Sequence, residues 1–113
     1  MGTSILAGRD WMALDNGMRL RLLSALEVLE ARREAEELAQ EERERPLCSN
    51  ACLLSRALET QDGEAVFASG RQVLSGLRIE EIAALADTWS RFNQAENPSL
   101  TMDQEQAERL KKN

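Results

Sequence analysis

The residues of this 113-residue chain best suited to chemistry are two cysteines, Cys48 and Cys52, and several pairs of adjacent glutamates. The cysteines are four positions apart, so in a helix both would lie on one face. The chain has no histidine to activate a thiol or complete a zinc site, and it has no tyrosine. We therefore expect two small, buried, reduced side chains, and neither a nucleophile, a metal site nor a disulfide.

The glutamate pairs are poorly placed for acid–base catalysis. They include Glu36–Glu37, Glu41–Glu42 and Glu80–Glu81. Adjacent residues diverge on a helix surface, and these pairs fall in segments that we expect to face water. A two-carboxylate active site needs a sheltered cleft, which a small helical domain is poorly suited to form. We expect a protein that is not an enzyme and binds no cofactor.

The net charge of the chain also limits the classes of partner that it can bind. Its formal net charge is −6, whereas a nucleic-acid backbone requires clustered lysine and arginine. A basic target segment, or solubility alone, suits this charge better. No apolar run approaches the roughly 20 residues that span a bilayer, and the N-terminus lacks the features of a signal peptide. The sequence predicts a cytoplasmic protein that binds neither nucleic acid nor a membrane.

The composition favours helices, because 42% of residues are apolar but only 4% are aromatic, and Glu and Arg are frequent. We predict an all-α fold of four to five helices in a single domain over residues 1–113. The longest helix is expected over 15–45, where Pro46 would end it. Its first half is amphipathic. Its second half, 31–45, is charged, and we expect it to be solvated or to form an oligomer contact or partner-binding arm.

The rest of the chain is predicted to form a compact helical core over 50–97 and a loosely held helix over 99–113. Asp62–Gly63 should form a turn, Ser69 should cap a short helix, and an amphipathic helix should start near Ile79. The expected core consists of large apolar side chains at helical spacing: Leu22, Leu26, Leu29, Leu54, Leu58, Phe67, Leu74, Leu77, Ile82, Leu85, Trp89 and Phe92.

Some apolar side chains fall outside this predicted core and are candidates for contact with a partner. They are Trp11, Leu14, Leu38, Met102 and Leu110. Trp11 and Leu14 have a second interpretation, in which they pack at the edge of the core beside the following helix.

An ordered pattern runs from Asn50 to Leu100, under half of the chain. Its parts are an apolar helix from Asn50 to Leu58, then Asp62-Gly63, Val66-Phe67, Ser69, Val73-Leu74 and Leu77, then Glu81-Ile82, Leu85 and the segment from Trp89 to Asn93. This pattern resembles that of the small tail assembly chaperones of long-tailed bacteriophages and prophages. Arg78 departs from it, since a serine or threonine cap would be expected there.

The resemblance implies a non-catalytic helical protein of the bacterial host cytoplasm. Such chaperones coat the long, helical tape measure protein and help to recruit the tail tube subunit, and self-association is expected. No active-site residue is carried over. Two alternatives remain open: a structural head–tail connector or tail completion subunit, and, outside phages, a secretion-type chaperone or small dimeric regulator.

Overall fold

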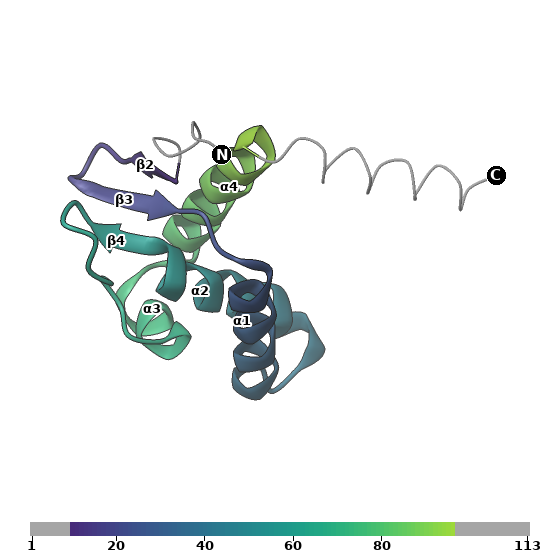
Figure 1. Cartoon of the computed structure of the whole chain (residues 1–113). Coiled ribbons are helices and arrows are strands. Elements are labelled where there is room, and N and C mark those ends of the chain that lie inside the picture. Colours follow the sequence, from purple (N-terminus) through teal and green to yellow (C-terminus); the bar gives the residue numbers. More distant parts are fainter. Residues whose placement is uncertain (1–9, 97–113) are drawn as a thin grey trace.

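The computed structural model describes residues 10–96 and contains both helices and strands (Figure 1). The elements in chain order are β2 (Trp11–Ala13), β3 (Met18–Arg21), α1 (Ala25–Leu38), the short 3-10 helix η2 (Glu42–Glu44), α2 (Arg45–Ala57), β4 (Leu58–Thr60), α3 (Gly70–Gly76) and α4 (Ile79–Glu96). The strands form an antiparallel sheet in the order β2-β3-β4. The predicted all-α fold is therefore wrong, because the described chain combines helices with a sheet.

The long helix predicted over 15–45 is also wrong. Met18–Arg21 forms strand β3, α1 ends at Leu38, and Pro46 lies in the first turn of α2 instead of ending a helix. Proline suits a first helical turn because its nitrogen carries no hydrogen that would be left without a partner there.

An Asn-Gly turn explains the first two strands. Gly17 has φ of 88°, which favours glycine, and its N–H donates to Leu14 O at 3.3 Å. The N–H of Leu14 in turn donates to Met18 O at 2.8 Å. The side-chain oxygen of Asn16 accepts from the N–H of Met18 at 3.0 Å. Asn-Gly between two short runs is a hairpin signal.

Helix α1 begins at a capping box. Ser24 Oγ accepts from the N–H of Glu27 at 3.1 Å, and the Glu27 carboxylate accepts from the N–H of Ser24 at 2.9 Å. The same carboxylate accepts two hydrogen bonds from Arg21 of β3. The bonds from Arg21 and Ser24 lower the pKa of Glu27 from 4.5 to about 2. This ion pair joins the end of β3 to the first turn of α1.

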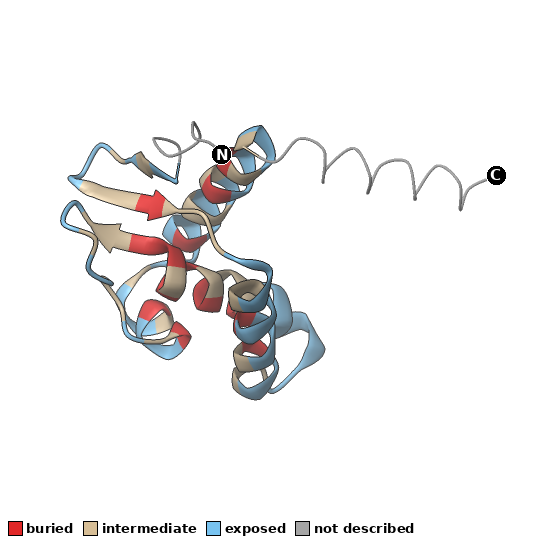
Figure 2. Cartoon of the chain, in the orientation of Figure 1, coloured by how far each residue is buried: buried red, intermediate tan, exposed pale blue. Residues whose placement is uncertain are grey.

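Helix α2 lies at the centre of the fold, between α1, α3 and α4 (Figure 1). One face packs Cys48 and Cys52 against Ala31 and Ala35 of α1. The other buried apolar residues of α2 join the main core, whose members are Leu20, Ala51, Leu54, Ala57, Leu58, Val73, Ile82 and Trp89 (Figure 2). The apolar helix expected from Asn50 to Leu58 is present, but it spans Arg45–Ala57, and Leu58 begins strand β4.

The predicted core is confirmed in part. Leu54, Leu58, Ile82, Trp89 and Phe92 are buried, and Leu22, Phe67, Leu74, Leu77 and Leu85 are partly buried. Leu26 and Leu29 are not core residues, because 59% and 45% of their surfaces are exposed. The turn at Gly63, the Ser69 cap and the start of α4 at Ile79 are confirmed. The predicted helix over 99–113 lies outside the described residues.

We expect Gly70→Ala to destabilise the fold. A Cβ at this position would overlap Cys52 Sγ and lie 3.0 Å from the Cys52 Cα, and that backbone cannot move without shifting α2. The strain should lower the free energy of unfolding by about 1–3 kcal/mol, in spite of the better helix propensity of alanine. Urea denaturation measures the loss. The matched control is Arg71→Ala, an exposed neighbour in α3. Equal stability of both variants and the wild type would contradict the close approach of α3 to α2.

The Glu27 ion pair should make the free energy of unfolding depend on pH in the acidic range. The folded-state pKa lies below the ordinary value of 4.5, so the carboxylate stabilises the fold above pH 4.5. This contribution is lost as the pH falls from 4.5 toward 2. We therefore expect Glu27→Gln to be less stable than the wild type at neutral pH, with a difference that shrinks across this window. Urea denaturation at a series of pH values measures it. Glu30→Gln, at an exposed position of α1, should show no such convergence.

Candidate functional site

The two thiols do not form a reactive site. Cys48 and Cys52 are free and buried where α2 meets α1. Burial raises the pKa of both thiols, and nearby carboxylates raise it further. For Cys52 the pKa is raised to about 12 by burial and by Glu34. Both thiols are therefore protonated at neutral pH and pack as small apolar groups, which confirms the prediction that they are buried.

The acidic residues are also dispersed. The paired glutamates at 36–37, 41–42 and 80–81 are all exposed. Between residues 10 and 96, no group of three or more cysteine, aspartate or glutamate side chains is arranged to hold a metal ion. In the same part of the chain, no helix combines the length and apolar character needed to cross a bilayer.

A hollow of about 590 Å³ lies between α1, α2 and α4. Most of its lining is apolar and includes Leu23, Val28, Leu29, Ala31, Leu53 and Trp89. Trp89 is fixed there because its Nε1–H donates to Arg21 O at 2.8 Å. Leu29 contributes a side chain that is 45% exposed, so this hollow presents apolar surface to solvent.

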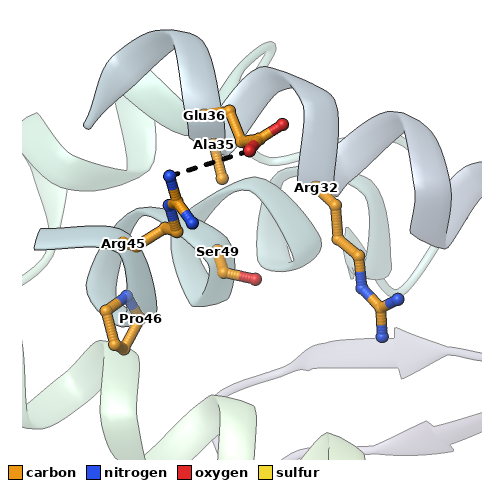
Figure 3. A pocket seen from close by; sticks show the side chains of 6 residues that line it. All are labelled: Arg32, Ala35, Glu36, Arg45, Pro46 and Ser49. Atoms are coloured by element: carbon orange, nitrogen blue, oxygen red, sulfur yellow. Dashed lines mark ion pairs between the residues drawn. The ribbon is translucent and has the colours of Figure 1, made fainter. Parts of the chain in front are cut away.

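A second hollow, of about 450 Å³, continues the first along α1 and α2 (Figure 3). Its lining residues are Arg32, Ala35, Glu36, Arg45, Pro46 and Ser49. Arg32 and Ser49 line both hollows, so the two adjoin at these residues, and together they are here named the helix groove. Along α1 the groove extends from Ala25 to Glu36, which at 1.5 Å per residue is about 16 Å. This length matches about three turns of another helix.

The wall of the helix groove forms where small side chains bring α1 close to α2. Ala31 and Ala35 are only 2% and 1% exposed and pack against Cys48 and Cys52. The prediction that 31–45 is a solvated extension is therefore wrong, because one face of α1 is buried through its last turns. The larger residues of α1, such as Leu29, lie beside this contact and line the groove.

Glu34 fixes α1 to two other helices. Its carboxylate accepts from Arg56 Nη1 of α2 at 2.8 Å and from the N–H of Gly70, the first residue of α3, at 2.8 Å. Burial raises the pKa of Glu34, but the hydrogen bonds from Arg56 and Gly70 outweigh burial and leave the pKa below its ordinary value of 4.5. A charged carboxylate therefore links α1, α2 and α3 beneath the groove wall.

The charges lining the helix groove differ from those of the whole chain. Arg45 lies 3.8 Å from Glu36, whereas Arg32 points away from Glu36 (Figure 3). Among the described residues, Arg32 has no ion-pair partner and the hydroxyl of Ser49 has no hydrogen-bond partner. The lining thus carries two arginines and one glutamate, an excess of one positive charge on a chain of net charge −6.

The predicted partner-binding residues lie elsewhere. Trp11 is 43% exposed on β2, with the Arg19 guanidinium carbon 4.7 Å from its ring centre. Trp11 and Leu14 line a common hollow of about 270 Å³. Leu38 does not line it. Leu14 also packs against the main core, and Leu38 packs against the Ala31–Cys52 cluster. Met102 and Leu110 lie outside the described residues.

The residues of the helix groove were not predicted as a site. Leu29 was placed in the core, and Arg32 was assigned to a solvated face. The available signal was the recurrence of small residues four apart, at Ala31 and Ala35 and again at Cys48 and Cys52. Such spacing indicates two helices in close contact, with a groove beside the contact.

Comparisons of the chain with protein-family models, with curated proteins and with solved structures gave no match.

We expect Glu34→Ala to loosen the groove wall. The substitution leaves Arg56 and the N–H of Gly70 without their acceptor, which should lower the free energy of unfolding by about 1–3 kcal/mol. Hydrogen exchange should accelerate in α1. Glu37→Ala, at an exposed position of the same helix, is the control and should change stability by less than about 0.5 kcal/mol. Unchanged exchange in α1 would show that Glu34 does not hold this helix in place.

Proposed function

We propose that this protein is a non-catalytic binding module that holds a helical segment of another polypeptide in the helix groove. The observation that carries the proposal is the solvent-facing apolar lining between α1, α2 and α4. Binding a helix there would remove exposed leucine surface from water, which contributes about 25 cal/mol per Å² buried. Leu29 lines the groove, and Leu26 of the same helix is 59% exposed. Amphipathic helices commonly bind to grooves of this kind.

The resemblance to tail assembly chaperones suggests a class of partner. We propose that the bound segment belongs to a tape measure protein and that binding keeps this partner soluble in the host cytoplasm during tail assembly. Self-association and recruitment of the tail tube subunit belong to the same proposal. The resemblance gave no expectation of a sheet, but none of the groove-lining residues belongs to a strand. The groove depends on helices α1, α2 and α4.

The electrostatics also suit a solubilising role. A net charge of −6 keeps a complex with an apolar partner dispersed through mutual repulsion. The groove lining contains no paired carboxylates, and the buried thiols are protonated, so binding of a polypeptide is the activity that this geometry supports best.

We expect Leu29→Glu to abolish binding while leaving the fold intact, because the side chain is already half exposed but lies in the groove. A carboxylate there would lose its water beneath an apolar helix face and would replace the apolar contact that Leu29 offers. The measurement is co-expression with a tape measure protein encoded beside this chain, followed by quantification of the soluble, co-purified partner. At least a tenfold loss is expected.

The matched control is Ile79→Glu, because Ile79 is 64% exposed and does not line the helix groove. It should retain wild-type binding. A tape measure protein that stays insoluble beside the wild-type chain would contradict the proposal. So would stoichiometric amounts of the chain in purified virions, which would instead favour the head–tail connector.

A further inference from the structure

We infer that the bound helix carries an acidic residue one turn away from an apolar anchor, and that Arg32 and Ser49 bind this carboxylate at the middle of the helix groove. The inference rests on the proposed function and specifies the chemistry of its partner. Its basis is the position of Arg32 and Ser49, which line both hollows and therefore lie where the two meet.

The two arginines of α2 are already paired. Arg45 is paired with Glu36 across the second hollow, and Arg56 is paired with Glu34 at 2.8 Å. Arg32 forms no ion pair within residues 10–96, and Figure 3 shows it extending away from Glu36. The hydroxyl of Ser49 also lacks a hydrogen-bond partner in this part of the chain. The groove therefore presents an unpaired guanidinium and a hydroxyl donor, which together suit a carboxylate.

The sign of the charge separates this groove from the rest of the molecule. The net charge of −6 by itself favours a basic target, but the groove lining has an excess positive charge. A carboxylate would be attracted in the groove and repelled by most other surfaces of the chain. This contrast would fix the register of the bound helix.

The spacing on α1 defines the complementary pattern. Leu29, Arg32 and Ala35 are three residues apart, so each follows the previous one by about one turn. A helix packed along this face would place an apolar side chain at position i in the wide hollow. Its acidic residue would follow at i+3 or i+4 beside Arg32, and a small apolar residue at i+7 would cover the exposed Pro46.

The cost of removing water from Arg32 reinforces this selectivity. A helix with only apolar residues would cover the Arg32 guanidinium and remove its water without supplying an acceptor. A glutamate at the central position would replace the lost water with a charge-assisted hydrogen bond. The groove therefore discriminates both by attraction to the acidic helix and by exclusion of the neutral one.

The test uses two synthetic stapled helices that differ at one position. One has leucine at i, glutamate at i+4 and alanine at i+7, and the other has glutamine in place of the glutamate. Isothermal titration to the wild-type chain should show roughly tenfold tighter binding of the glutamate peptide. This preference should shrink in high salt. Arg32→Gln should bind both peptides equally, whereas Arg33→Gln, at an exposed position beside the groove lining, should keep the preference.

The outcomes separate the two proposals. Equal binding of both peptides to the wild type, abolished by Leu29→Glu, would overturn the role of Arg32 and support the groove as a helix-binding site. Binding of neither peptide would overturn both proposals. As a further check, Arg32→Glu should prefer a third peptide with lysine at i+4, and failure of this charge reversal would count against direct contact.

Discussion

The position of α1 is the constraint on which the other features depend, and Glu34 is the residue that fixes it. Its carboxylate bonds Arg56 of α2 and the N–H of Gly70 in α3, so one charge satisfies donors from two other helices. Glu34 is partly buried, with 22% of its side chain exposed, and these partners replace the water that its carboxylate has lost. Because α1 forms one wall of the helix groove, this contact helps to hold that wall in place.

Small side chains determine how closely the helices approach. Ala31 and Ala35 meet Cys48 and Cys52, and Gly70 of α3 lies against Cys52 of the same helix. Close backbone contact at these points leaves no space for the larger residues of α1 between the helices. These residues lie to the side of the contact, where they form an open apolar surface. The compact interior and the exposed groove therefore have a common physical cause.

The sequence predicted those elements whose signals were local and unambiguous. Ser69 capped α3 as expected, and the regular spacing from Ile79 identified α4. The predictions from sequence were wrong where the same residues fit two different structures. Pro46 can follow one helix or begin the next, and residues from Met18 onward fit helical spacing as well as strand alternation, so the turn at Gly17 was overlooked. The small residues of α1 and α2 indicate only that these two helices meet. The full lining of the groove was not predictable, because it comes from three helices whose arrangement depends on long-range contacts.

Arg32 indicates how binding specificity arises in such a groove. Arg32 is exposed and forms no ion pair within residues 10–96, so its charge contributes little to folding. Local choices of this kind, which do not serve stability, are expected where a protein contacts something else. Glu36 is on the next turn of the same helix, but its carboxylate pairs with Arg45 of α2 and not with Arg32. The folded structure itself thus keeps a donor available at the centre of the surface proposed to bind a helix.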